Sequence, residues 1–382
     1  MSMKITIITS PFGYVPPLGI GAVEKIWYDL SIEFVNKGNQ VKIISKRPEH
    51  EGYTNNLLDK NGINNIYIKG YKRKRSVYLD LIFDFLYSIN SLMRIEKTDI
   101  LVMNTFWTPF LCRFFKKKYK VSIYNVARFP KNQFKYLSNV DKLVACGSMI
   151  GEAVIKQAPR LQNVCVINNP VNQNIYYYTS IGDIEDTVHV VYTGRLHPEK
   201  GLFNLVKALS SLSVEKKIKL SLIGTNDIRR GGGGKEYCNE LKKYVKNFEL
   251  DFVGEISDPT LLAQYMRTAH IYCYPPLPTT GDAMPCAPLE AMALGLPVIV
   301  SDIPCFDDYV FHEKNGIRFN VKENAVENLK AALEDLIENA SKRRKLGLYA
   351  AETAKQFSCP CIADRFLDLF MILCDGEGLA EN

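Results

Sequence analysis

The chain has 382 residues, of which 47% are hydrophobic and 23% are charged, and its formal net charge is +7. This length and composition exclude a disordered chain and predict a globular protein of two domains. Met1–Lys4 runs directly into an apolar strand pattern without a secretory signal, and the longest charge-free stretch, 161–182, is too rich in Asn, Gln and Tyr to cross a bilayer, so we expect a cytoplasmic protein without a membrane-spanning helix.

Strand-like and helix-like segments alternate through the first half of the chain. The strand-like apolar runs lie at 4–10, 40–45, 65–69, 99–104, 120–125, 141–146 and 164–168. Most segments between them are long enough for helical crossovers, notably Gly21–Lys37, Val77–Glu96 and Met149–Gln157. Because parallel strands need such crossovers, the alternation predicts a parallel sheet covered by helices.

Positive charge is concentrated in this first half. Residues 1–174 contain 25 Lys and Arg against 12 Asp and Glu, whereas residues 175–382 contain 23 against 29. Aromatic and basic side chains interleave in two clusters, Tyr71–Arg75 and Phe114–Lys120. Such clusters suit an anionic membrane surface or a nucleic acid. We expect a membrane surface rather than a nucleic acid, contacted by Lys72, Arg73, Lys74, Arg75, Lys116, Lys117 and Lys118.

A second alternating series follows a polar segment at 168–187. Its strand-like runs lie at 188–194, 218–224, 250–254, 270–274, 297–301 and 316–319, with helices expected at Leu202–Leu212 and Glu323–Glu338. The chain therefore divides into doubly wound α/β domains at 1–172 and 173–357, followed by a helical segment, Ile362–Leu373, within 358–382. Open parallel sheets bind ligands at the carboxyl ends of their strands, so two Rossmann-like domains facing each other predict a cleft lined by strand-to-helix loops.

Metal and disulfide chemistry are disfavoured by the spacing of the possible ligands. The ten cysteines include no Cys-x-x-Cys pair, and the five histidines form no ligand-spaced cluster. We expect reduced, structural thiols and a site that needs no metal ion.

The first candidate site lies in the loop after the strand at 188–194. Arg195 and Lys200 follow Gly194 and precede a helix that is expected to begin near Gly201. A guanidinium, an ammonium and the free backbone N–H groups of a helix start together make a site for an anion. A diphosphate has the matching charge.

The second candidate site holds two carboxylates, Asp282 and Glu290. A helix is expected to begin at Pro288, with Glu290 in its first turn. A glutamate there can accept hydrogen bonds from both hydroxyls of a ribose, while Asp282 can bind hydroxyls of a sugar ring. The backbone positions at the helix start that would line this site are Ala287, Pro288 and Leu289. Two carboxylates also serve glycoside hydrolases, but that alternative leaves the cations of the first candidate site without a role.

Of two glycine-rich segments, only the first is a further candidate for phosphate contact. Gly19 and Gly21 precede a helix expected to open near Ala22, and they would let backbone amides approach a ligand closely. Their Gly-x-Gly-x-x-Glu pattern, well beyond the end of the first strand, disfavours an ordinary dinucleotide site. The run RRGGGGKEY at 229–237 departs from the Walker pattern and is expected to be a flexible loop.

In this order the motifs resemble the retaining nucleotide-sugar glycosyltransferases of the GT-B fold, in the large family four. The resemblance covers nearly the whole chain and rests on YTGRLHPEKG (192–201), LIGTND (222–227), DAMPCAPLEAMALGLPVIVSDIP (282–304) and NGIRF (315–319). It implies that Arg195 and Lys200 hold the donor diphosphate, that Glu290 holds the ribose and that Asp282 touches the transferred sugar. The sequence departs from the family at Asp282, where Glu is usual, and at Pro285, where a glycine is usual.

The same resemblance implies roles for the other parts of the chain. The first domain would bind the acceptor, with Arg128 and Trp107 on the acceptor side, and the second would bind the donor. Gly19 and Gly21 would contact the donor phosphates from the first domain. The last helix would cross back and brace the first domain.

The function implied by the resemblance is retaining transfer of a hexose-type sugar from a nucleoside-diphosphate donor, with a UDP-sugar favoured over a GDP-sugar. The acceptor would be lipid-linked or a glycan in bacterial surface polysaccharide assembly, at the inner face of the cytoplasmic membrane. No cofactor or metal ion is then required. Three alternatives stay open: a GT-B-like nucleotide-sugar epimerase, a basic nucleic-acid-binding protein without transferase activity, and a related chain that binds without catalysing.

Overall fold

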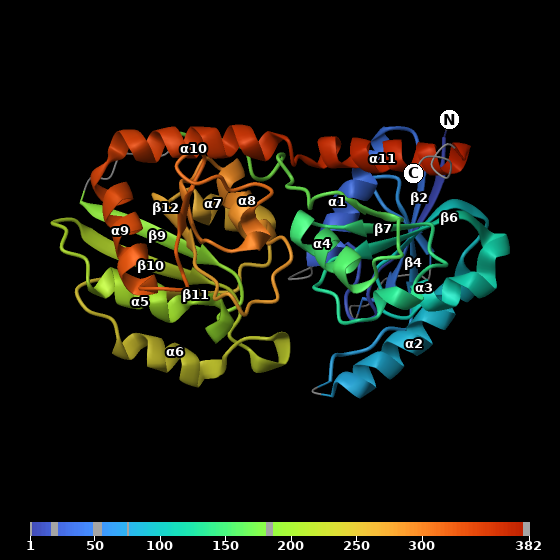
Figure 1. Ribbon diagram of the computed structural model, residues 1–382, viewed down its shortest axis with the longest axis horizontal. Helices are drawn as coiled ribbons and strands as arrows, with labels where there is room; N and C mark the ends of the chain where they lie inside the picture. The colour runs from blue at the N-terminus through green and yellow to red at the C-terminus, as the bar shows by residue number, and fades with distance from the viewer. Residues whose placement is uncertain (1, 17–21, 49–55, 75, 181–185, 377–382) are drawn as a thin grey trace. The chain divides into compact units, whose positions relative to one another are not determined.

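The structure is a computed structural model that describes residues 2–16, 22–48, 56–74, 76–180 and 186–376. It consists of two compact units (Figure 1). Unit 1 comprises Met1–Pro170 together with Cys359–Asn382, and unit 2 comprises Val171–Ser358. The boundaries expected from the sequence fall after residues 172 and 357.

Unit 1 contains an eight-stranded sheet in the order β3-β4-β2-β1-β5-β6-β7-β8. The strands are β1 Lys4–Ile8, β2 Gln40–Lys46, β3 Asn56–Leu58, β4 Asn64–Ile68, β5 Thr98–Met103, β6 Tyr119–Val126, β7 Lys142–Ala145 and β8 Val164–Val166. Neighbouring strands pair in parallel except β3 and β4, which are antiparallel. The sequence does not predict β3, because three residues are too few to show an alternating pattern.

Helices from both ends of the chain pack together in unit 1. The helices are α1 Ala22–Asn36, α2 Val77–Arg94, α3 Thr108–Leu111, α4 Ser148–Gln157 and α11 Cys359–Asp375. The Phe366 ring of α11 lies 5.2 Å from the Trp27 ring and 6.5 Å from the Phe34 ring of α1, between centroids. α11 begins at Cys359, earlier than expected, because Pro360 lies in the first helical turn, where its missing N–H would have no partner anyway.

Unit 2 contains a six-stranded parallel sheet in the order β11-β10-β9-β12-β13-β14. The strands are β9 Thr187–Thr193, β10 Lys217–Ile223, β11 Glu249–Gly254, β12 Ile271–Tyr274, β13 Val298–Ser301 and β14 Ile317–Phe319. The chain runs outward to one edge from β9 and to the other edge from β12, so the strand order reverses between these two neighbours. A ligand site is expected at such a reversal.

Six helices accompany the sheet of unit 2 among the described residues. They are α5 Leu202–Ser210, α6 Gly234–Lys243, α7 Pro259–Met266, α8 Cys286–Ala293, α9 Ala325–Glu338 and α10 Ala340–Lys355. The sequence prediction omits α10, whose buried face is formed largely by small residues such as Gly347, Ala350 and Ala354 and gives a weak apolar pattern. The predicted α/β class with two doubly wound sheets is confirmed.

The structure also bears on disulfide bonds and on membrane-spanning helices. None of the ten cysteines, all of which lie in the described ranges, is in a disulfide, and most of them are buried. In the described part of the chain, no helix combines the length and the apolar character that crossing a bilayer requires.

Candidate functional site

The first candidate site lies where the strand order of unit 2 reverses. β9 and β12 are adjacent and parallel, so the loops that follow them begin at the same edge of the sheet. The backbone N–H of Leu277 in the second loop donates to the carbonyl of Glu199 in the first, at 2.8 Å. Gly201 has φ +66°, and a Cβ on it would overlap the carbonyl oxygen of Pro275. A glycine is therefore required where the two loops meet.

Lys200 is bound by a residue that lies 82 positions away in the sequence. Its Nζ donates to both carboxylate oxygens of Asp282, at 2.6 and 2.7 Å, and its side chain is only 3% exposed. Tyr274 donates its hydroxyl to the same carboxylate at 3.0 Å, and Lys200 Nζ lies 5.5 Å from the centroid of the Tyr274 ring. Because an unpaired buried ammonium is strongly unfavourable, Asp282 stabilises Lys200 in this position.

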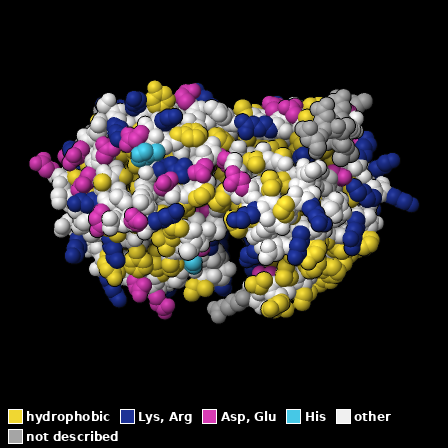
Figure 2. Space-filling model, viewed as in Figure 1, with side chains coloured by type: hydrophobic (Ala, Val, Ile, Leu, Met, Phe, Trp, Pro, Cys, Tyr) yellow, Lys and Arg dark blue, Asp and Glu magenta, His cyan; other side chains and the backbone are white. Residues whose placement is uncertain are grey.

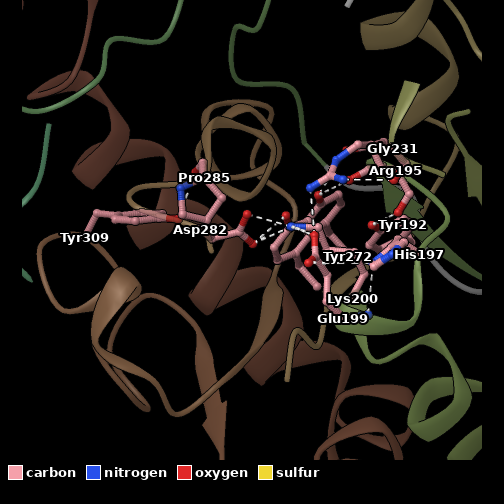
Figure 3. A network of polar contacts seen from close by, with 12 residues as sticks. Tyr192, Arg195, His197, Glu199, Lys200, Gly231, Tyr272, Asp282, Pro285 and Tyr309 are labelled. Carbon is pink, nitrogen blue, oxygen red and sulfur yellow. Dashed lines mark hydrogen bonds and ion pairs between the residues drawn. The ribbon is translucent and has the colours of Figure 1, made fainter. Parts of the chain in front are cut away.

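Arg195 joins the same network through Glu199 (Figure 3). Arg195 Nη2 contacts Glu199 Oε1 at 2.7 Å, and Lys200 Nζ lies 3.9 Å from the same oxygen. Arg195 Nη1 donates to the carbonyl of Gly231 at 2.8 Å. These bonds use two of the five N–H groups of a guanidinium, and the Arg195 side chain is 39% exposed. The predicted cations thus lie together, and each has a carboxylate partner.

Glu199 and Tyr274 are members of the network that the sequence prediction omits. Glu199 lies in the same loop as Arg195, four residues later, so their proximity could be expected from the sequence. Tyr274 gives no such signal, because it reaches Asp282 only through the position of β12.

The glycine run after β10 is held against the Arg195 loop and differs from the flexible loop expected. The N–H of Gly233 donates to the Leu196 carbonyl at 2.7 Å, and that of Gly234 donates to the Asn226 carbonyl at 2.9 Å. A Cβ on Gly232 would overlap the backbone of Asn226. The run therefore allows the close backbone approach that places the Gly231 carbonyl on Arg195.

Buried tyrosines surround the carboxylate of Asp282. Burial raises the pKa of Tyr192, Tyr272 and Tyr274 well above the ordinary value, and the charge of Asp282 raises the pKa of Tyr192 and Tyr274 further. These hydroxyls stay protonated at neutral pH and act as hydrogen-bond donors. Tyr192 donates to the Arg195 carbonyl at 2.9 Å and so fixes the start of the loop.

The helix of the second candidate site begins earlier than expected. α8 starts at Cys286 after an extended Pro285, and Pro288 is its third residue, where a missing N–H is tolerated. Glu290 therefore lies in the second turn, and the prediction of a first-turn position is wrong. Its side chain is half-buried. Burial is the main cause of the raised pKa of Tyr272, and the charge of Glu290 adds to it, so Glu290 lies near Tyr272 of β12.

The start of α8 is fixed by a contact from Tyr309. The Tyr309 hydroxyl donates to the carbonyl of Pro285 at 2.9 Å (Figure 3). Of the predicted positions at this helix start, Leu289 is fully buried and Ala287 is half-buried. The Leu289 side chain therefore belongs to the core, and only its backbone is left for ligand contact.

Comparison with known proteins gives a family match over part of the chain. Residues 180–353 match the family described as glycosyl transferases group 1. The match covers just under half of the chain and lies within unit 2. One relative, an uncharacterized glycosyltransferase of Methanocaldococcus jannaschii, is 28% identical over 152 residues, which are 40% of this chain and 36% of the relative. Another, the phosphatidyl-myo-inositol mannosyltransferase of Mycobacterium leprae, is 26% identical over 186 residues, or 47% of this chain and 46% of that protein. The matches thus span less than half the length of either relative.

Solved structures share the fold over nearly the whole chain. Sucrose-phosphate synthase from Thermosynechococcus elongatus has a TM-score of 0.79 at 17% identity, covering 98% of this chain and 100% of that one. Anabaena HepE in complex with UDP and glucose has a TM-score of 0.73 at 18% identity, with coverage of 97% and 99%. At this identity the likeness concerns the fold, and the predicted GT-B fold is confirmed.

The residues predicted for the acceptor side lie in unit 1. Trp107 follows β5 and Arg128 follows β6, so both are placed at the carboxyl ends of neighbouring strands. Trp107 is half-buried and its Nε1 donates to the Leu81 carbonyl at 3.0 Å, whereas Arg128 is exposed. Gly19 and Gly21 lie outside the described residues.

The two predicted basic clusters have unequal surroundings. Lys72, Arg73 and Lys74 are exposed, and Arg75 lies outside the described residues. In the second cluster, Lys116 pairs with Asp141 at 3.2 Å, and Lys118 donates to backbone carbonyls of α2. Lys117 is exposed. Part of the second cluster therefore has a structural role in unit 1.

Proposed function

We propose that this chain is a retaining glycosyltransferase that moves a hexose-type sugar from a nucleoside-diphosphate donor to an acceptor. The observation that carries the proposal is the network of Arg195 and Lys200 with Glu199 and Asp282 at the reversal of the sheet. The match of residues 180–353 to the glycosyl transferases group 1 family supports it. Structures of Anabaena HepE with UDP and with UDP-glucose favour a UDP-sugar as the first donor to test, followed by a GDP-sugar.

The difficult step is departure of the nucleoside diphosphate from the anomeric carbon. The remaining N–H groups of Arg195 and the ammonium of Lys200 stabilise the negative charge that develops on the leaving diphosphate. Glu199 and Asp282 hold the two cations in position before the donor binds, so little rearrangement is needed at the moment of reaction.

The other residues of the site act on the donor. Glu290 accepts hydrogen bonds from the ribose, and Asp282 contacts the transferred sugar while it stays bound to Tyr274. The acceptor hydroxyl attacks from the face of the departing diphosphate and gives its proton to that phosphate, so the configuration is retained. This scheme requires neither a protein nucleophile nor a metal ion.

The acceptor is lipid-linked or a glycan in the assembly of a bacterial surface polysaccharide. The protein works in the cytoplasm, peripherally at the inner face of the cytoplasmic membrane. The basic excess of residues 1–174 and the exposed cations Lys72, Arg73, Lys74 and Lys117 support this part of the proposal. Arg128 and Trp107 are the residues proposed for the acceptor side.

A thermal-shift screen across UDP-, GDP- and ADP-sugars tests the donor. A donor that binds only the folded chain at 100 times its dissociation constant stabilises it by about 2.7 kcal/mol. We expect the shift to be lost in Lys200→Ala and kept in Lys235→Ala, whose lysine is exposed on α6 of the same unit. No shift with any of the three donors would contradict the proposal.

Product analysis with a radiolabelled donor tests the reaction itself. Transfer of label to an acceptor preparation from bacterial membranes, with unchanged anomeric configuration, is the expected result. A free modified sugar formed without acceptor would instead show an epimerase. A salt-sensitive gel shift with no donor binding would show a nucleic-acid-binding protein.

A further inference from the structure

Helix α2 of unit 1 turns its polar side inward. Asp84, Ser88 and Ser91 are buried on this helix, whereas Tyr78 is 82% exposed and Met93 58% exposed. A surface helix of a globular protein ordinarily has the opposite arrangement, with its apolar stripe against the core. Tyr87 and Leu92 are also buried on the inward side, but packing within unit 1 does not explain the apolar residues that α2 exposes.

Contacts with the loop after β5 explain why the polar side faces inward. The Asp84 carboxylate accepts the backbone N–H of Phe106 at 3.2 Å and that of Trp107 at 3.0 Å. Ser88 donates to Asp84 at 3.3 Å, and its hydroxyl lies 3.1 Å from the hydroxyl of Thr105. Asp84 and Ser88 thus bind this loop, and most of the apolar residues of α2 are left on the outside.

The outer apolar residues lie on one side of the helix. The outer face of α2 is defined here as Tyr78, Ile82, Phe85, Leu86 and Met93, all exposed. Their spacing of four, three, one and seven residues places them along one stripe. Figure 2 shows hydrophobic side chains gathered at the lower right of the view, where Figure 1 shows α2. A continuous exposed apolar stripe of this kind marks a contact with a partner or a membrane.

Cations lie at both ends of this stripe. Lys72, Arg73 and Lys74 directly precede α2. At its other end, Lys118 Nζ donates to the carbonyls of Leu92 and Met93 at 3.2 and 2.6 Å, which joins the basic 3₁₀ segment η1, Cys112–Lys118, to the end of α2.

The acidic residues of α2 accept hydrogen bonds from backbone N–H groups of unit 1. The helix sequence contains two of them, and Asp84 is buried. The other, Asp80, accepts the backbone N–H of Lys74 at 2.8 Å. An apolar stripe with basic ends and little negative charge has the pattern of helices that lie at the surface of an anionic membrane.

We infer that α2 lies in the plane of an anionic membrane and inserts its outer face among the lipid acyl chains. The cations at its two ends contact the headgroups. The inference rests on the membrane partner in the proposed function and adds insertion to electrostatic contact. Because salt screens charges but not apolar insertion, part of the attachment survives an ionic strength that removes purely electrostatic adsorption.

Vesicle binding by the full chain tests the inference. Vesicles of phosphatidylglycerol and phosphatidylcholine are compared with vesicles of phosphatidylcholine alone, at low salt and at 0.5 M salt. We expect the double variant Ile82→Ser/Leu86→Ser to bind anionic vesicles roughly tenfold or more weakly than the wild type. The matched control Ile155→Ser/Leu261→Ser removes two exposed apolar residues outside α2 and is expected to bind within about twofold of the wild type.

A tryptophan at position 78 reports insertion directly. In Tyr78→Trp, we expect a blue-shifted emission on anionic vesicles and quenching by lipids brominated on their acyl chains. Binding that disappears at 0.5 M salt without a blue shift would overturn insertion. So would a concentration-dependent dimer, seen by sedimentation velocity and lost in Ile82→Ser/Leu86→Ser, without vesicle binding.

The donor assay separates this inference from the proposed function. Donor-dependent stabilisation depends on unit 2 and is expected to be equal in the wild type and in Ile82→Ser/Leu86→Ser. Failure of the vesicle test with normal donor binding therefore overturns only the inference about α2. Failure of donor binding with normal insertion overturns only the proposed donor chemistry.

Discussion

Lys200 of unit 2 and the exposed lysines of unit 1 have opposite surroundings. Lys200 is 3% exposed and bound by both oxygens of Asp282, whereas Lys72, Lys74 and Lys117 are exposed to solvent. A buried cation held by two hydrogen bonds has a fixed position, and solvent screens it little. An exposed lysine contributes attraction without a fixed position. The first arrangement suits action on one atom of one ligand, and the second suits a charged surface.

The largest effect is expected when the buried cation is removed. Lys200→Ala takes away a positive charge beside the proposed diphosphate and leaves Asp282 without its partner. By analogy with the loss of one oxyanion donor, transfer should fall by roughly 100-fold to 1,000-fold. Transfer of a labelled sugar measures it, with Lys235→Ala as the control. Activity within about threefold of the wild type, in a folded variant, would remove Lys200 from the site.

A second large effect is expected where the two loops of unit 2 meet. Gly201→Ala combines a left-handed backbone with an overlap on Pro275, so we expect a loss of about 3 kcal/mol or more of unfolding free energy. Gly254→Ala is the matched control, because Gly254 has φ +82° and open space around its Cα. It should cost only about 1 to 2 kcal/mol. Denaturant unfolding measures both, and equal losses would show that the loops are not tightly packed.

Exposed lysines should have smaller and graded effects. Lys117→Ala removes a solvent-exposed cation, worth about 1 kcal/mol near an anionic leaflet, so vesicle affinity should fall about fivefold. Lys116→Ala is the comparison, because Lys116 pairs with Asp141 and its charge is partly neutralised. Sedimentation with anionic vesicles measures both. A greater loss in Lys116→Ala than in Lys117→Ala would contradict the assignment.

The smallest effect is a pH dependence in unit 2. Burial lowers the pKa of His189, whose ring nitrogens lie 2.9 Å from the Ser221 hydroxyl and 3.1 Å from the Thr268 carbonyl. His189 therefore binds a proton less readily in the folded chain than in the unfolded chain, where the pKa of histidine is about 6.5. The contribution of His189 to stability is complete above that pH and decreases below it. Between pH 7 and pH 5, denaturant unfolding should show a smaller loss of unfolding free energy in His189→Gln than in the wild type. An equal dependence of unfolding free energy on pH in the two proteins would exclude His189 as the cause.

The sequence predicts those parts of the site that depend on local spacing. Arg195 and Lys200 lie in one loop after a recognisable strand, so their proximity follows from the motif. The partners of these cations are harder to predict, because Asp282 reaches Lys200 through the pairing of β9 with β12. The Gly231 carbonyl reaches Arg195 through a close backbone approach that leaves no pattern in the sequence.

The buried face of α2 and the start of α8 could not be predicted from the sequence, for other physical reasons. A helical period at 77–94 predicts a helix, but the period alone does not say which face is buried, and in α2 the loop after β5 selects the polar one. For α8, proline is allowed at any of the first helical positions, so the start at Cys286 and the second-turn position of Glu290 could not be read from Pro288.

The position of α11 in the chain determines the order in which the two units are completed. Unit 1 needs α11, since Phe366 and Phe370 fill the space beside Trp27 and Phe34 of α1. Unit 2 is encoded between the two parts of unit 1. During synthesis on the ribosome, unit 2 therefore has its full sequence first. The earlier segments of unit 1 must wait with exposed aromatic side chains until the last helix emerges.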